Sequence, residues 1–187
     1  LSRQRAAFDR DGAPSLAQRK ADLRKLKTAV LARRSEIEAA LNADFGNRSA
    51  YETRIMELVP IVQTINYLRR NLKAWMRPER RRVAIHFTGA RAYVVQQPLG
   101  VVGIISPWNY PLSLALIPLA TALAAGNRVM LKPSELAPAT SAFLKRMLEE
   151  LYGDDRVAVV TGGADVGATF ASLPFDHLAF TGSTAVG

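Results

Sequence analysis

Apolar and polar positions follow two periods along this chain, and the clearest combination of the two runs from residue 101 to residue 135. Residues 101–105 form a short apolar run, which is typical of a strand buried on both faces. After a polar turn, apolar residues recur three and four positions apart up to Leu123, and this spacing predicts a helix that Gly126 ends. A second apolar run, 128–131, predicts a strand that delivers Lys132 at its carboxyl end.

The alternation of helix and strand continues to the end of the chain. The pattern predicts a helix over 138–151, a strand over 156–160, a helix over 165–172 and a strand over 177–180. Strands that are separated by helices pair in parallel through right-handed crossovers. We therefore predict an α/β fold in which residues 99–187 form a parallel sheet with flanking helices.

Residues 1–82 are predicted to be helical, and two capping boxes mark where their long helices begin. The first helix begins at the capping box formed by Ser15 and Gln18. It keeps an apolar stripe over 16–41 and ends at Gly46. These helices carry no obvious chemistry.

The second capping box consists of Ser49 and Glu52 and opens a stripe over 55–76. Pro60 is expected to bend this second helix near its first turns, and Pro78 to end it.

Residues 83–98 change character and predict a β-hairpin, with strands over 83–87 and 91–96 around Gly89. His86 lies between apolar neighbours in the first of these strands, with no Asp, Glu or second His close to it in the sequence. We therefore interpret His86 as a structural residue and predict no metal site.

Composition narrows the class of protein. The chain has 187 residues, is 49% hydrophobic and has a mean hydropathy of +0.02, which suits one soluble domain with a sizeable core. Apolar runs of membrane-spanning length are interrupted by Gly, Pro or charge, and neither a signal peptide nor a transit pattern is recognisable. With no cysteine in the sequence, a cytoplasmic protein is the expectation.

Charge is distributed unevenly and raises an alternative. Residues 1–82 hold 19 Lys+Arg and 9 Asp+Glu, a net charge of +10, whereas residues 83–187 hold 6 and 7, a net charge of −1. A basic half can bind nucleic acid, and Arg77 and 80–82 are its densest point. However, the basic residues are spread over amphipathic helices with acidic ones, without interleaved aromatic residues or a nucleic-acid motif. Solvated helix faces explain them better, so we expect no nucleic-acid partner.

Polar residues follow two neighbouring strands of the predicted sheet. Trp108 and Asn109 lie in the first strand-to-helix turn, and Lys132 to Glu135 in the second. Ligands bind at this edge of open α/β sheets. For Asn109 the alternative is a turn or helix-cap residue, and for Lys132 a solvated surface lysine. The glycines 162–163 and Gly182 follow the other two strands, where backbone has to come close to a ligand.

Three motifs carry a family resemblance: PWNYP from Pro107, KPSE from Lys132 and FTGS from Phe180. Together they resemble the signatures of the NAD(P)-dependent aldehyde dehydrogenase superfamily, most closely the class 3 branch and, within it, the coniferyl aldehyde dehydrogenases. The resemblance implies a Rossmann-like cofactor domain that lacks the usual G-x-G-x-x-G fingerprint, which this sequence also lacks. It covers nearly the whole chain but less than half of the family's enzyme, and so identifies an N-terminal fragment.

The resemblance also implies roles for particular residues. Asn109 is similar to the amide that donates to the oxyanion of the thiohemiacetal intermediate. Lys132 and Glu135 are similar to the pair that binds the adenosine ribose. Ser183, with Gly182 at a helix N-terminus, is similar to the group that contacts the pyrophosphate. The wall beside it would be formed by Ile105, Ser106, Pro107 and Trp108, and the remaining cofactor contacts would come from Ser134, Gly163, Gly167, Phe180 and Thr181.

Cofactor, substrate and assembly follow from the same resemblance. The cofactor is NAD, with NADP also allowed, and Glu135 should favour NAD because a carboxylate repels a 2′-phosphate. The substrate is an aldehyde, and the hairpin would contribute to a homodimer or higher oligomer. In the family, a cysteine nucleophile and a glutamate base lie beyond the matched part, so the 187 residues alone should oxidise no aldehyde. A non-catalytic nucleotide-binding module is the alternative function, and a basic nucleic-acid-binding domain is a weaker one.

Overall fold

Four parallel strands form the sheet around which the chain is arranged, as the sequence predicts. In the computed structural model, which describes residues 1–185 and 187, the strand order is β5-β4-β3-β6. Strand β3 (Val101–Ile105) lies between β4 (Arg128–Lys132) and β6 (His177–Phe180), and β5 (Val157–Val159) is at the edge. After β3 the chain adds β4 and β5 on one side of it, and then places β6 on the other side. Strand β3 therefore borders the point where the strand order reverses, which is where α/β proteins bind ligands.

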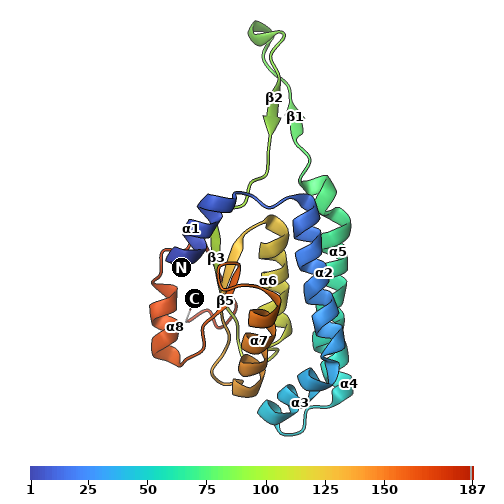
Figure 1. Ribbon diagram of the computed structural model, residues 1–187, viewed down its shortest axis with the longest axis vertical. Helices are drawn as coiled ribbons and strands as arrows, with labels where there is room; N and C mark the ends of the chain where they lie inside the picture. The colour runs from blue at the N-terminus through green and yellow to red at the C-terminus, as the bar shows by residue number, and fades with distance from the viewer. Residues whose placement is uncertain (186) are drawn as a thin grey trace.

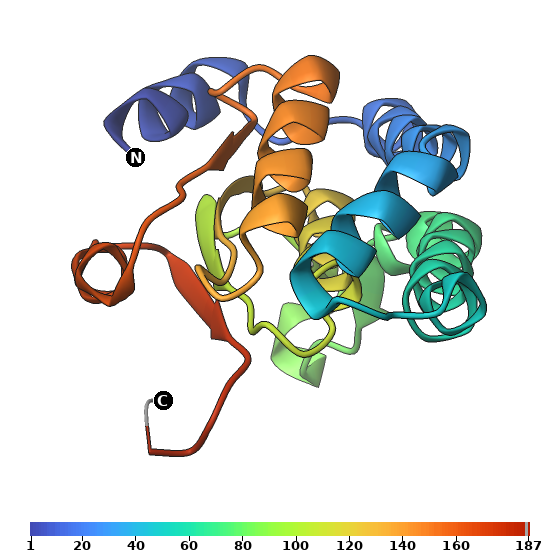
Figure 2. The same ribbon diagram turned by 90° about the horizontal axis from the view of Figure 1, so that it is seen from below.

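Helices cover both faces of this sheet. Helices α6 (Ser113–Ala125) and α7 (Pro138–Leu151) pack on one face, and α8 (Ala164–Ala171) lies on the opposite one (Figures 1 and 2). The five helices and strands predicted after Gly126 keep their bounds to within one residue, and α7 and β6 match their predictions in full. Gly126 ends α6 with a left-handed backbone, φ 95°.

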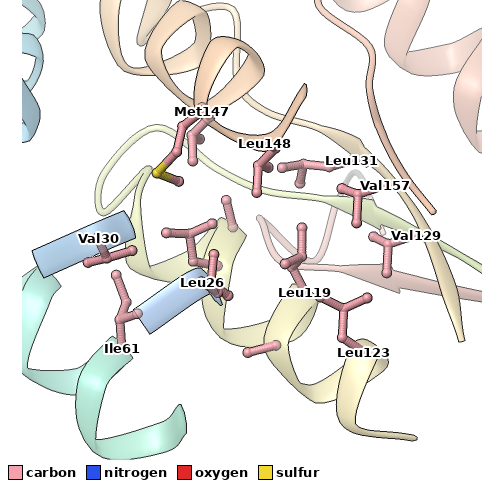
Figure 3. Close-up of a cluster of buried hydrophobic side chains, with 14 of the residues drawn as sticks. Leu26, Val30, Ile61, Leu119, Leu123, Val129, Leu131, Met147, Leu148 and Val157 are labelled. Atoms are coloured by element: carbon pink, nitrogen blue, oxygen red, sulfur yellow. The ribbon is translucent and has the colours of Figure 1, made fainter. Parts of the chain in front are cut away.

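A further layer of N-terminal helices covers α6. It consists of α2 (Leu16–Ala32) and α5 (Val59–Trp75), followed at its lower end by α3 (Arg34–Phe45) and α4 (Ala50–Thr53). The core fills the space between these helices and the sheet, as Figure 3 shows for side chains of α2, α5, α6, α7, β4 and β5. Leu26, Ile61, Leu119 and Leu131 are all fully buried there. The apolar stripes predicted from the sequence therefore face this core.

The two long N-terminal helices are less continuous than predicted. Ser15 caps α2 by accepting a hydrogen bond from the Gln18 amide, but the helix breaks at Arg33 before α3 begins. The second helix contains a π-helical turn, Arg54–Leu58, directly before Val59 and Pro60. Proline has no amide proton to donate back along a helix, and a change of hydrogen-bonding pattern ahead of it accommodates that loss.

The hairpin is present but its first strand was predicted at the wrong place. Strand β1 (Glu79–Arg81) pairs with β2 (Ala92–Val94), and Ile85–Phe87 form a 3₁₀ turn instead of the predicted strand. The hairpin projects from the body (Figure 1), and Ile85 and Phe87 are largely exposed. Without a buried face, the alternation of side chains does not fix the register, so pattern alone misplaced the strand.

Helix α1 (Ser2–Asp11) lies in the part predicted to be helical but was not predicted as a separate helix, and it is joined to the sheet by polar contacts. Gln4 donates to the Val129 carbonyl oxygen at 2.8 Å, and Arg128 donates to Ala7 O at 2.8 Å and to Asp11 at 2.6 Å. None of the described helices is both long and apolar enough to cross a membrane. Among the residues described, no group of His, Asp or Glu side chains is arranged to hold a metal ion.

Candidate functional site

Three strand ends meet at one edge of the sheet because of the register of the strands. Ile105, the last residue of β3, pairs with Lys132 of β4 on one side and with Phe180 of β6 on the other. The turns that follow these strands, together with α8, enclose a groove of about 900 Å³. Its lining includes Ile105, Ser106, Pro107, Trp108, Asn109, Lys132, Ser134, Glu135, Gly167, Phe180, Thr181, Gly182 and Ser183. Every predicted site residue except Gly163 therefore lines a single groove.

Asn109 lies in the turn after β3 and is exposed to the groove. Its side chain does not cap the helix that follows, since α6 has no side-chain cap of its own and the Ser113 amide donates instead to Glu57 at 2.6 Å. The main-chain oxygen of Asn109 accepts a hydrogen bond from Arg48 at 3.1 Å. Within the described residues the side-chain amide makes no hydrogen bond, so the helix-cap alternative for Asn109 is wrong.

Lys132 is not a surface lysine. Its side chain is 5% exposed, and its ammonium lies 2.6 Å from the carboxylate of Glu135, which is itself 40% exposed. The hydrogen bond from Lys132 lowers the pKa of the Glu135 carboxyl below its usual value of 4.5. The end of β4 thus presents an ion pair whose cation is buried and whose anion reaches the solvent.

Ser106 and Trp108 supply the wall of the groove next to β3. The Ser106 hydroxyl is buried and has no hydrogen-bond partner in the described part of the chain. Trp108 is 51% exposed, and its ring lies 6.4 Å from that of Phe45. A buried hydroxyl without a partner costs free energy, and a ligand that supplies one relieves that cost.

Gly163 lies in a neighbouring hollow of about 830 Å³, which shares Ser134 and Glu135 with the groove. Gly167, by contrast, faces the groove from α8, where a methyl group in place of its hydrogen would lie 3.6 Å from Lys132 Cε. The two hollows therefore adjoin at Ser134 and Glu135, and Gly163 lies outside the groove that holds the other predicted site residues.

The loop after β6 carries three of the predicted site residues, Thr181, Gly182 and Ser183. Thr181 donates its amide to the Ile105 carbonyl oxygen at 3.1 Å, and a side chain at Gly182 would overlap the ring of Phe180. Ser183 is not at a helix N-terminus in the described residues; Val186, which the expected helix would include, lies outside them. The Gly187 amide donates a hydrogen bond to Ser183 O at 3.2 Å, which is the spacing of a helical turn, and the expected helix stays a prediction.

Sequence reasoning missed two charged residues beside the groove, Arg48 and Glu57. They come from the N-terminal helical part, and local pattern gives no sign of their contact with the Asn109 turn. On the groove face of α8 only Gly167 was predicted. Ala164, Ala168 and Ala171 were missed, although with Gly167 these small residues recur at helical spacing.

Comparison with known proteins decides which family this fold represents. Residues 2–187 match the Aldehyde dehydrogenase family. The chain belongs to this family. A probable coniferyl aldehyde dehydrogenase of Pseudomonas aeruginosa is 49% identical over the whole chain, which corresponds to 39% of that protein. The resemblance found in the sequence motifs is confirmed, and the chain spans about two fifths of the length of such relatives.

Solved structures of this family share its fold. Staphylococcus aureus AldH in a substrate-bound state superimposes with a TM-score of 0.94 at 33% identity, covering the whole chain and 40% of that protein. A Mycobacterium tuberculosis aldehyde dehydrogenase complexed with NAD⁺ gives a TM-score of 0.85 at 30% identity, covering the whole chain and 38% of that protein. The predicted class, an α/β fold with a parallel sheet, is confirmed.

Proposed function

We propose that this chain is the cofactor-binding part of an aldehyde dehydrogenase that oxidises an aldehyde to the carboxylic acid with NAD⁺. The observation that carries the proposal is the groove, which joins Asn109 at one end to the Lys132–Glu135 pair at the other. Both lie at the edge of the sheet where α/β proteins bind nucleotides. Membership of the family and a relative solved with NAD⁺ support the same cofactor.

The residues present suit a dinucleotide. A buried ammonium and a neighbouring carboxylate offer a donor and an acceptor to the two hydroxyls of a ribose, which is the role we assign to Lys132 and Glu135. The unpartnered Ser106 hydroxyl offers a further polar contact. We assign Ser183 and the Gly182 backbone to the pyrophosphate, and the hollow beside Gly163 to the adenine end.

We infer that Asn109 stabilises the negative charge that develops on the aldehyde oxygen. Its amide protons are free for a ligand within the described structure and need not be lost, so the donor is the same at every pH of interest. Bound NAD⁺ would supply the acceptor for the hydride. The chain contains no cysteine, so the nucleophile of this chemistry would come from beyond these 187 residues.

Substrate, compartment and assembly are part of the same proposal. The relative in Pseudomonas aeruginosa suggests an aromatic, coniferyl-type aldehyde. A thiol nucleophile favours the cytoplasm, where cysteines stay reduced. The projecting hairpin, with Ile85 and Phe87 exposed, suits a contact between subunits of a homodimer or larger oligomer.

The test compares the complete protein with the 187-residue chain. With coniferyl aldehyde and NAD⁺ present, the complete protein should produce reduced nicotinamide and the carboxylic acid, and a short aliphatic aldehyde serves as the comparison substrate. The 187-residue chain should produce neither. If the complete protein binds NAD⁺ but oxidises no aldehyde, the non-catalytic nucleotide-binding module becomes the better description. If the short chain reduces NAD⁺ with an aldehyde, our assignment of the missing nucleophile is wrong.

A further inference from the structure

Arg48 is a charged residue that the fold buries beside the Asn109 turn. It lies in the loop between α3 and α4, yet its side chain is only 4% exposed. The guanidinium carbon lies 4.6 Å from the centre of the Phe45 ring and 5.0 Å from that of Tyr110. From this position one nitrogen donates to the main-chain oxygen of Asn109 at 3.1 Å. The N-terminal helical part thus contacts the turn that carries Asn109.

Glu57 holds the other end of the same turn. It is fully buried, and one of its carboxylate oxygens accepts a hydrogen bond from the Ser113 amide at 2.6 Å, at the start of α6. Its second oxygen lies 3.6 Å from Arg48. Burial raises the pKa of the Glu57 carboxyl, while the Ser113 amide and the charge of Arg48 act in the opposite direction.

A π-helical turn places Glu57 where it can do this. The turn, Arg54–Leu58, contains Glu57, and turns of this kind are frequent at functional sites. Burying a carboxylate and a guanidinium costs more than burying apolar side chains of the same volume. Packing alone therefore does not account for the pair, whereas its two hydrogen bonds fix the backbone of the turn on either side of Tyr110.

We propose that Arg48, paired with Glu57, is a positioning residue that fixes the Asn109 turn so that its side-chain amide is aimed into the groove. The proposal rests on the function proposed above, in which Asn109 donates to the aldehyde oxygen. Such a donor acts within a narrow range of distance from the developing charge, so a small shift of the turn weakens it. Arg48 itself lies outside the lining of the groove.

Variants of the complete enzyme test this role. Arg48→Met keeps the apolar stem between the two rings and removes the hydrogen bond to Asn109 O. We expect its kcat to fall about tenfold or more, because misplacement of a catalytic group by a fraction of an ångström has effects of this size. The Kd for NAD⁺ should stay within about twofold of the wild-type value, since the turn at Lys132 is unaffected. Arg48→Lys keeps the charge beside Glu57 but loses the planar guanidinium. Its kcat should therefore lie between that of the wild type and that of Arg48→Met.

Arg54→Met is the matched control. Arg54 belongs to the same π-helical turn and pairs with Glu38 at 2.7 Å, but it is 45% exposed and lies outside the groove lining. Its removal should leave kcat unchanged. Circular dichroism and thermal unfolding establish that each variant is folded, and if Arg48→Met fails to fold, Arg48→Lys and Arg48→Gln carry the comparison.

A double variant separates positioning from general damage. If Arg48 acts through Asn109, then adding Arg48→Met to Asn109→Ala should lower kcat no further than Asn109→Ala does alone. A folded Arg48→Met enzyme with wild-type kcat, or a double variant in which the two losses multiply, would overturn the proposal. A wild-type enzyme that oxidises no aldehyde would instead overturn the proposed function, and the role of Arg48 with it.

Discussion

Replacement of Lys132 by Met is the sharpest test of how the groove binds its cofactor. The substitution removes the ammonium but keeps an unbranched apolar stem of similar length, which suits a side chain that is 5% exposed at the end of β4. Glu135 loses its partner at 2.6 Å, but because it is 40% exposed, its carboxylate can turn to the solvent. The variant therefore changes the binding group without leaving a buried charge unpaired.

The size of the effect follows from the burial of the two groups. A hydrogen bond made by a charged donor contributes about 1.5–3 kcal/mol, which corresponds to a rise of about 10- to 150-fold in the Kd for NAD⁺. The loss in folding stability should be smaller, at most about 1 kcal/mol, since solvent screens the exposed end of the pair. Affinity and stability should consequently respond by clearly different amounts.

Titration calorimetry with NAD⁺ on the complete enzyme measures the change in Kd, and thermal unfolding without cofactor measures the change in stability. Lys27→Met is the control, because Lys27 lies on α2, outside the lining of both hollows, and donates a hydrogen bond to Asn66 at 2.8 Å. That control should bind NAD⁺ as the wild type does. A Lys132→Met enzyme that keeps its affinity within about twofold would refute the assignment of Lys132 to the ribose.

Three further predictions concern other residues of the groove and its surroundings. Asn109→Ala should lower kcat by about two powers of ten, equivalent to about 3 kcal/mol, with the Kd for NAD⁺ nearly unchanged; a variant that is destabilised but catalytically near normal would show a turn role instead. Glu135→Gln should narrow the preference for NAD over NADP, measured as the ratio of kcat/KM values, and an unchanged ratio would remove Glu135 from discrimination. Burial raises the folded-state pKa of Glu57 above 4.5, so its stabilising contribution is present below that pH and is lost as the pH rises through the folded value. Unfolding experiments should therefore show the wild type losing stability relative to Glu57→Gln over this rise, whereas a difference independent of pH would contradict the burial argument.

The sheet and its edge could be predicted because their signals are local. Each buried strand is a short apolar run, each helix after it has its own period, and Gly126 supplies a left-handed end. Once the strands are parallel, their carboxyl ends meet at one edge, so Asn109 and Lys132 had to lie near one another. The groove thus follows from the order of elements, without knowledge of any distant contact.

Other features depend on information that a local pattern does not contain. The hairpin has no buried face, so its first strand was misplaced by several residues. The break at Arg33 and the π-helical turn before Pro60 interrupt apolar stripes that continue through them unchanged. The helix expected at Ser183 was carried over from the family resemblance, not from the residues, and is not seen among the described residues. The division into segments at residues 82 and 98 stays a prediction.

The N-terminal helices appeared to carry no chemistry, yet the structure gives them a part in shaping the groove. Asp44, near the end of α3, accepts hydrogen bonds from the Ala139 and Thr140 amides at 2.8 Å each, and so caps the N-terminus of α7 directly after the Lys132–Glu135 turn. This carboxylate satisfies two of the amides that would otherwise be free at that helix end. Arg48 and Glu57 hold the Asn109 turn in a comparable way. We therefore infer that the basic, helical half of the chain supports both turns, and the absence of a nucleic-acid partner stays a prediction.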